Sequence, residues 1–177
     1  MKLVVLDRDG TINHDSDKYI KSPAEWKPIK GSLEAIARLT QAGFRVVVAT
    51  NQSGIARGLF DMATLNAIHD TMHRAVHQAG GRIEAIFFCP HAADAGCGCR
   101  KPKPGMLLEI AERMNVDLAS VPMVGDSRKD IESAAAAGAR PVLVLTGNGR
   151  KTADAGNLPE GTEVHADLAA FAAKLAP

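Results

Sequence analysis

The chain has 177 residues, of which 46% are hydrophobic and 23% charged, with 21 Lys and Arg against 20 Asp and Glu. That length suits one domain with a core large enough to need no disulfide support. A net charge of +1 argues against a broad basic surface for nucleic acid or anionic lipid. The aromatic content of 4% also argues against a base-stacking platform, so we expect no nucleic-acid partner and no membrane partner.

Cysteine usage and the lack of long apolar runs bear on the compartment. An odd count of three cysteines does not fit a secreted disulfide scaffold and leaves thiols free for metal or redox chemistry. The apolar start of the chain is too short for a signal peptide, and no run approaches the roughly 18 apolar residues of a membrane span. We expect a cytoplasmic monomer.

Short apolar runs alternate along the chain with segments of helical periodicity. The runs are rich in Val and Ile and do not alternate with polar residues, which is typical of strands covered on both faces in a parallel sheet. The predicted strands are Leu3–Leu6, Arg45–Ala49, Ala85–Phe88, Val121–Val124 and Pro141–Leu145. The predicted helices are Ser32–Ala42, Met62–Ala79, Gly105–Met114, Lys129–Ala137 and Asp167–Leu175.

This alternation predicts an α/β fold with one doubly wound parallel sheet of Rossmann-like strand order 3-2-1-4-5, in a single domain spanning residues 1–177. No segment is left that could form a separate lid, so we expect no cap domain and only short loops around a ligand. The polar, glycine-rich segment Gly147–Gly161 is predicted to be a surface loop.

Chemically useful residues follow three of the predicted strands. Asp7 and Asp9 come after the first strand, Thr50 after the second and Asp126 after the fourth. In open α/β sheets, ligands bind beyond the carboxyl ends of the strands. A charged side chain at the end of an apolar strand is costly to bury unless it binds a metal or takes part in a reaction. A nucleophilic Asp7 would need Mg²⁺ to reduce the repulsion between two anions, with Asp126 as a second carboxylate and Asp9 as general acid and base. Each acid alone would be interpreted as a cap or turn; together they indicate phosphoryl transfer.

The same residues resemble the motifs of the haloacid dehalogenase-like phosphatases. Residues 7–11 match motif one, residues 49–51 motif two, Lys101 motif three and residues 125–130 motif four. The resemblance covers nearly the whole chain. It implies that Asp7 is the nucleophile and Asp9 the general acid and base, and that Thr50 and Lys101 contact the phosphoryl group.

The resemblance also implies a metal-ligand set. Mg²⁺ would be held by Asp7, the backbone carbonyl of Asp9 and Asp126, while Asp130 would lie behind these ligands and orient Lys101. Lys101 is preferred to Lys103 as the lysine of motif three, because it follows an arginine, as the corresponding lysine does in the subfamily that this sequence most resembles.

Two short pairs of metal-binding residue types lie in one segment. Cys89 and His91 are followed by Cys97 and Cys99, which together supply the Cys₃His set of a closed, structural Zn²⁺ site. The alternative is three unrelated thiols and a surface histidine. We expect a zinc-binding loop at about residues 89–101, which would stiffen the segment that carries the following arginine and lysine.

A lidless phosphatase with such a loop resembles the subgroup that acts on heptose bisphosphate or histidinol phosphate. The histidinol-phosphate branch has an acidic residue where Ser53 stands and lacks the arginine at Arg57, so the heptose branch is favoured. The predicted substrate contacts are Asn51, Gln52, Ser53, Arg57, Arg100 and Tyr19. Of these, Arg57 and Arg100 would bind the second anion of a small sugar bisphosphate.

The resemblance therefore implies Mg²⁺-dependent hydrolysis of the 7-phosphate of D-glycero-D-manno-heptose 1,7-bisphosphate, with the β anomer favoured, through an aspartyl-phosphate. Such an enzyme would serve ADP-heptose and lipopolysaccharide core biosynthesis. The alternatives are a phosphatase for histidinol phosphate or another small sugar phosphate, a receiver-like signalling domain, and an inactive zinc-stabilised module. His69, His73 and His77 recur along one helix and are interpreted as the boundary of its buried face.

Overall fold

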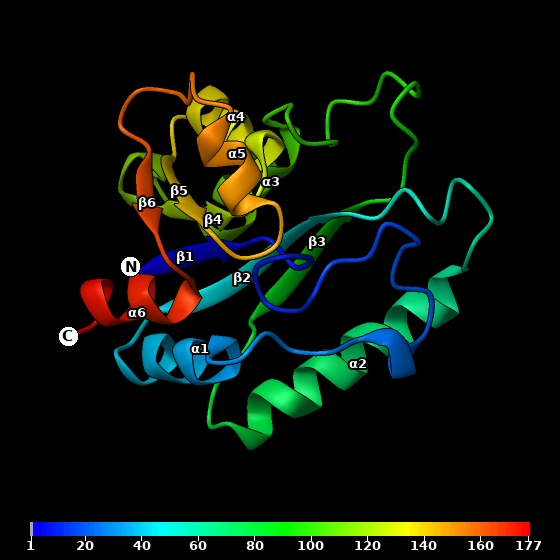
Figure 1. Cartoon of the computed structure of the whole chain (residues 1–177), viewed down its shortest axis with the longest axis horizontal. Helices are drawn as coiled ribbons and strands as arrows, with labels where there is room; N and C mark the ends of the chain where they lie inside the picture. The colour runs from blue at the N-terminus through cyan, green and yellow to red at the C-terminus, as the bar shows by residue number, and fades with distance from the viewer. Residues whose placement is uncertain (1) are drawn as a thin grey trace.

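The computed structural model describes residues 2–177, which are built around one six-stranded parallel sheet (Figure 1). Its strand order is β3-β2-β1-β4-β5-β6, which confirms the predicted order of the first five strands. The strands are β1 (Leu3–Leu6), β2 (Arg45–Asn51), β3 (Ala85–Cys89), β4 (Pro122–Gly125), β5 (Arg140–Val144) and β6 (Glu163–His165).

Two short elements lie in a part of the chain where the sequence predicts none. The segment predicted to be a surface loop contains the helix α5 (Gly149–Asp154), and β6 lies between this segment and the last helix. β6 is an edge strand of three residues, and its Val164 is 48% exposed. A strand that is so short and so little buried has no hydrophobic pattern for sequence analysis to detect.

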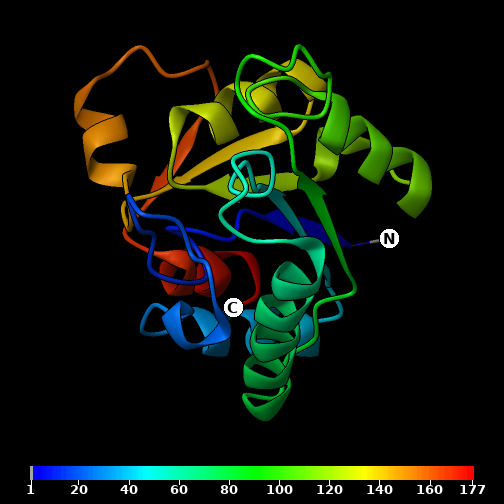
Figure 2. The same cartoon turned by 90° about the vertical axis from the view of Figure 1, so that its right-hand side faces the viewer.

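Helices cover both faces of the sheet (Figures 1 and 2). One layer contains α1 (Ser32–Gln41), α2 (Met62–Gln78) and α6 (Leu168–Leu175). The opposite layer contains α3 (Gly105–Met114), α4 (Arg128–Ala137) and α5. Two single-turn 3₁₀ helices, η1 (Pro23–Glu25) and η2 (Leu118–Ser120), lie in the connections.

The apolar strands are explained by burial on both sides. Along β1, Val4 and Leu6 belong to the core formed with α1, α2 and α6, whereas Leu3 and Val5 belong to the core formed with α3 and α4. All four β1 side chains are at most 2% exposed. Side chains alternate between the two faces, so a strand packed on both sides has to be apolar at every position.

The topology brings the polar strand ends to one place. β1 pairs with β2 on one side and with β4 on the other, both in parallel, so the carboxyl ends of these three strands lie at the same edge. The connections after β2 and β3 extend beyond that edge, at the right of Figure 1. Within residues 2–177 no insertion forms a cap domain, as predicted. No helix in this range is long and apolar enough to cross a membrane.

Candidate active site

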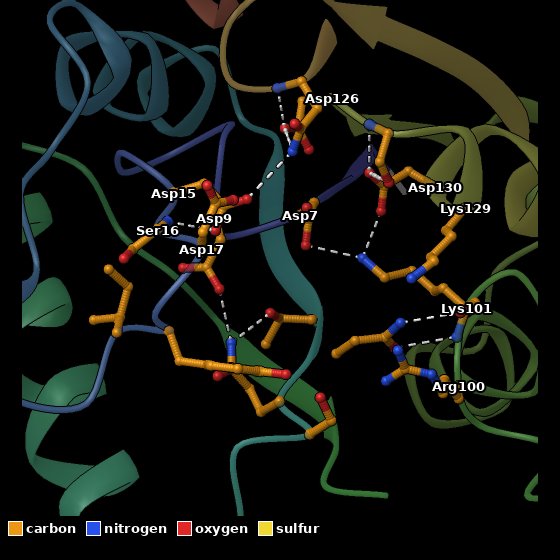
Figure 3. Close-up of a pocket in the computed structure, with 18 residues that line it drawn as sticks. Asp7, Asp9, Asp15, Ser16, Asp17, Arg100, Lys101, Asp126, Lys129 and Asp130 are labelled. Carbon is orange, nitrogen blue, oxygen red and sulfur yellow. Dashed lines mark hydrogen bonds and ion pairs between the residues drawn. The ribbon is translucent and has the colours of Figure 1, made fainter. Parts of the chain in front are cut away.

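A cavity of about 440 Å³ opens at the carboxyl edge of β1, β2 and β4 (Figure 3). The structure brings most of the predicted site residues together around it. Those that line it are Asp7, Asp9, Tyr19, Thr50, Asn51, Gln52, Ser53, Arg100, Lys101, Asp126 and Asp130. Arg57, a predicted substrate contact, is not among the lining residues, and its guanidinium lies 5.8 Å from the centre of the Tyr19 ring.

Lys101 is the central cation of the site. Its Nζ donates to Oδ1 of Asp7 at 2.9 Å, to Oδ1 of Asp130 at 2.6 Å and to the carbonyl of Ala49 at 2.7 Å. Burial opposes its charge, but the two carboxylates outweigh burial and raise the pKa of Lys101 above its usual value. Through these two ion pairs, Lys101 joins the end of β1 to the start of α4.

The position of Lys101 is set through its backbone. The amide of Asn51 donates to the Lys101 carbonyl at 3.0 Å and accepts from the Lys101 N–H at 3.1 Å. This pair of hydrogen bonds ties the motif-three segment to the end of β2. Lys103 points elsewhere and donates to the carbonyl of Cys97, so the lysine in the cavity is Lys101.

Three buried carboxylates lie together on one side of the cavity. Oxygens of Asp7, Asp126 and Asp130 lie within 4.8 Å of one another. Burial and the charge of Asp130 raise the pKa of Asp7 well above its usual value, and the same two causes raise the pKa of Asp126 to about 7. One ammonium does not balance this negative charge, and carboxylate oxygens are the ligands that Mg²⁺ prefers. The donor set therefore fits Mg²⁺.

Asp126 is held by the segment that follows β5. The backbone N–H of Asn148 donates to Oδ2 of Asp126 at 2.8 Å, and the hydroxyl of Thr152 donates to its carbonyl at 3.0 Å. The hydroxyl of Thr146 in turn donates to the carbonyl of Gly10 at 2.7 Å. The sequence predicts only a surface loop here, and its Gly and Asn residues are too ordinary a signal to reveal a contact with a site acid.

Asp9 lies at the cavity wall with both oxygens occupied. Oδ1 accepts from Nε of Arg8 and the amide of Asn13, both at 2.9 Å, and Oδ2 accepts from Nη2 of Arg8 and the amide of Gln52, both at 3.1 Å. Burial would raise the pKa of Asp9, but the charge of Arg8 and these hydrogen bonds outweigh it and leave the pKa below its usual value. The bidentate contact with Arg8 and the two amide donors thus favour the carboxylate form of Asp9.

The polar residues at the end of β2 contact one another. Besides Asp9, the Gln52 amide donates to the hydroxyl of Thr50 at 2.9 Å, and both side chains are buried. Thr50 keeps its own hydroxyl proton to donate to a ligand. The amide nitrogen of Gln52 is occupied by protein partners, and Ser53 completes this wall.

The rim of the cavity is divided by charge, as Figure 3 shows. Arg100 and Lys129 lie on one side, and Asp15 and Asp17 on the other. Lys129 was not predicted as a site residue, because the sequence does not show which side chain of the first turn of α4 reaches the cavity. The hydroxyl of Ser127, the residue after Asp126, donates to Asp130 at 2.8 Å.

The predicted zinc ligands also meet. Sγ of Cys89 lies 3.1 Å from Sγ of Cys99, 3.7 Å from Sγ of Cys97 and 3.4 Å from Nδ1 of His91, while Cys99 and His91 are 3.3 Å apart. A tetrahedron with bonds of about 2.3 Å has edges of about 3.8 Å. Four soft ligands at nearly this spacing fit a Zn²⁺ ion. The carbonyl of His91 also accepts from Arg100 at 3.4 Å, which links this cluster to the basic rim.

The fold and the site together are typical of one family of phosphatases, and comparison with known proteins points to the same family. The model of the HAD-hydrolase-like family matches residues 98–171. A Rossmann-like sheet with a strand-end acid pair, a buried lysine and a second acidic strand end is the arrangement of these enzymes. The chain belongs to the haloacid dehalogenase-like (HAD) phosphatases.

Individual relatives narrow the comparison. The D-glycero-beta-D-manno-heptose-1,7-bisphosphate 7-phosphatase of Bordetella bronchiseptica is 65% identical over 99% of this chain and 98% of its own. The crystal structure of D,D-heptose 1,7-bisphosphate phosphatase from B. bronchiseptica, complexed with magnesium and phosphate, has a TM-score of 0.98 with the same coverage. The enzyme from Burkholderia thailandensis is 58% identical, with a TM-score of 0.80 over 99% of this chain and 98% of its own.

Gly10 lies directly against the Asp126 carboxylate, so a substitution at Gly10 tests how closely the site is packed. Its φ is +87°, and a Cβ at this position would overlap the Asp126 carboxylate. We predict that Gly10→Ala lowers kcat about 100-fold, because a displaced carboxylate no longer holds its ligand in place. Gly43→Ala is the matched control, since Gly43 has a φ of +83° and no atom within 4 Å of such a Cβ.

Both substitutions carry the left-handed strain of about 1–2 kcal/mol and should lower the thermal midpoint. Gly10→Ala should lower it further, because its Cβ also overlaps the buried Asp126 carboxylate. Only Gly10→Ala should lose activity. Equal specific activities of the two folded variants would contradict the steric account.

Proposed function

We propose that this chain hydrolyses the 7-phosphate of D-glycero-β-D-manno-heptose 1,7-bisphosphate, a small sugar bisphosphate, in a Mg²⁺-dependent reaction. The observation that carries the proposal is the buried Asp7–Lys101–Asp130 array beside Asp9, in a cavity with a basic rim. The names of the similar enzymes support the substrate. Such an activity would serve ADP-heptose and lipopolysaccharide core biosynthesis, with the chain acting as a single domain.

In the first half-reaction, an oxygen of Asp7 forms a bond to phosphorus and the bond from phosphorus to the sugar oxygen breaks. Protonated Asp9 gives its proton to that oxygen, so the sugar leaves as an alcohol. Asp9 is a carboxylate before substrate binds, and the negative charge of an incoming phosphate favours its protonated form. Lys101 and the hydroxyl of Thr50 stabilise the phosphoryl oxygens as charge develops.

In the second half-reaction, water attacks the phosphorus of the aspartyl-phosphate. The Asp9 carboxylate takes a proton from that water, the bond from phosphorus to Asp7 breaks, and the Asp7 carboxylate and inorganic phosphate are released. Asp9 takes back in this step the proton equivalent that it gave in the first. The sum is one ester and one water converted to one alcohol and one phosphate.

The carboxylates of Asp7 and Asp126 and the backbone carbonyl of Asp9 would hold Mg²⁺. When bound, the ion supplies positive charge that reduces the repulsion between Asp7 and the phosphate. Asp130 stays with Lys101 and orients its ammonium toward Asp7. All the groups in this scheme lie on one chain, so the reaction requires no second copy.

We assign the second phosphate of the substrate to the basic rim. Arg100 and Lys129 lie on the same side of the cavity and offer two cations to a dianion. Asp15 and Asp17, on the opposite side, are acceptors for sugar hydroxyl groups. Arg57 would act through Tyr19, on which its guanidinium rests, and not by touching the phosphate.

The acidic rim also supports a second candidate. Histidinol phosphate carries a cationic amine, and Asp15 and Asp17 would pair with it. Phosphate release measured from the β and α anomers of the bisphosphate and from histidinol phosphate decides between them. We expect the highest kcat/KM for the β bisphosphate, and a preference for histidinol phosphate would overturn the substrate assignment.

We also propose that the Cys89–His91–Cys97–Cys99 cluster holds a structural Zn²⁺ ion. All four ligand positions come from the protein, which leaves no open position for a substrate. The bound ion would fix the loop that carries Arg100 and Lys101 into the cavity.

The basic rim is tested by Lys129→Ala. Loss of one charge-assisted contact is worth about 1.5 kcal/mol or more, so KM for the 1,7-bisphosphate should rise at least about tenfold. KM for the heptose 7-monophosphate should not change, because that substrate lacks the second phosphate. Lys151→Ala, which removes an exposed lysine outside the cavity, is the control. An equal rise for both substrates would contradict the assignment.

The zinc proposal is tested by Cys99→Ser together with elemental analysis. We expect about one zinc per wild-type chain, and loss of zinc with a fall in kcat of about tenfold or more in the variant, because Lys101 is no longer positioned. His73→Ala, a histidine outside the cluster, should keep its zinc and its activity. Wild-type protein that is fully active without zinc would show that the cluster has another role.

A further inference from the structure

Arg8 is a completely buried cation next to the proposed acid and base. Its exposed fraction is 0%, and it follows Asp7 directly at the end of β1. A guanidinium without water is stable only when its N–H groups have partners inside the protein. Arg8 therefore has to be explained by what its nitrogens contact.

Two of these nitrogens bind Asp9. Nε reaches Oδ1 and Nη2 reaches Oδ2, so the ion pair is bidentate. A planar guanidinium bound in this way fixes the plane of the carboxylate as well as its position. Asp9 is thereby held at the cavity wall in a single orientation.

The third nitrogen binds a histidine from a different element. Nη1 of Arg8 lies 3.1 Å from Nε2 of His69, which is on α2 and only 6% exposed. Arginine has no acceptor, so the guanidinium donates and Nε2 of His69 carries no proton. Burial and the charge of Arg8 lower the pKa of His69 to about 3, which agrees with a neutral ring. The sequence places His69 at the edge of a buried helical face and gives no sign of this contact.

We propose that Arg8 and His69 are positioning residues for Asp9. His69 holds the guanidinium of Arg8 in the orientation in which both Nε and Nη2 reach the carboxylate, and Arg8 in turn aims Asp9 at the leaving oxygen. Neither residue touches the substrate. The inference rests on the proposed phosphatase activity, and it makes the middle of α2 part of the support for proton transfer.

The leaving group distinguishes this role from a merely structural one. The sugar oxygen leaves as a strongly basic alkoxide unless Asp9 protonates it, whereas p-nitrophenolate is weakly basic and leaves without a proton. If Asp9 is not correctly oriented, the first half-reaction of the sugar ester therefore slows, whereas that of p-nitrophenyl phosphate keeps its rate. A loss of folded enzyme slows both esters equally.

The experiment is a single-turnover measurement of leaving-group release from the 1,7-bisphosphate and from p-nitrophenyl phosphate, with enzyme in excess and Mg²⁺ present. For His69→Leu we expect release of the sugar to slow about tenfold or more, a part of what a general acid contributes, and release of p-nitrophenol to change less than about threefold. His69→Gln, which keeps an acceptor at a similar reach, should restore both rates. His73→Leu, one helical turn away, is the control.

Equal slowing of both esters by His69→Leu, or no slowing of either, would overturn the proposal. If His69→Leu does not fold, Arg8→Lys takes its place, since it keeps the cation but loses the bidentate contact, and the same selective loss is expected. A wild-type protein that releases neither leaving group would contradict the proposed function itself. The two failures are thus distinguishable.

Discussion

The site depends on one buried ammonium among carboxylates. Lys101 contacts Asp7 and Asp130, which are respectively 8% and 1% exposed, and its own exposed fraction is 2%. Removing one partner from such a buried pair costs about 3–5 kcal/mol, because the other charge is left without compensation. Asp7, which follows β1, and Asp130, in the first turn of α4, can therefore lie at this edge together only if the lysine is placed between them. The third acid, Asp126, remains under-compensated, which is why the site suits a divalent cation.

The rest of the structure keeps these charges in place. Asn51 binds the backbone of Lys101, and the four side chains of the Cys₃His cluster meet in the loop before Lys101. Asp130 has a second role, since its other oxygen accepts from the N–H and the hydroxyl of Ser127 in the capping box of α4. The same carboxyl group thus caps the N-terminus of α4 and holds the ammonium of Lys101. Residues 2–177 form no cap domain, and the charged side chains of the site are held instead by short connections to strands and helix ends.

Much of the fold and of the site could be predicted, because the site residues stand directly after apolar strands or at short, regular spacing in the sequence. The acids after β1 and β4 and the four Cys and His residues at 89–99 are visible as sequence patterns. What was missed depends on tertiary contacts: His69 lies on an ordinary amphipathic helix, and Asn148 follows a strand in a glycine-rich segment. Lys129 could not be placed because the first turn of α4 decides which side chain reaches the rim. The three-residue strand β6 has too few residues to form a pattern.

Attack of Asp7, the partner of Lys101, on phosphorus would leave a phosphoryl group on its carboxylate. The measurement is rapid quenching of the enzyme with 1,7-bisphosphate that carries radioactive phosphorus in its 7-phosphate, followed by digestion and location of the labelled peptide. We expect an acyl-phosphate on Asp7 that forms and decays at rates consistent with turnover. Label on another residue, or full turnover with no protein-bound phosphoryl group, would contradict it.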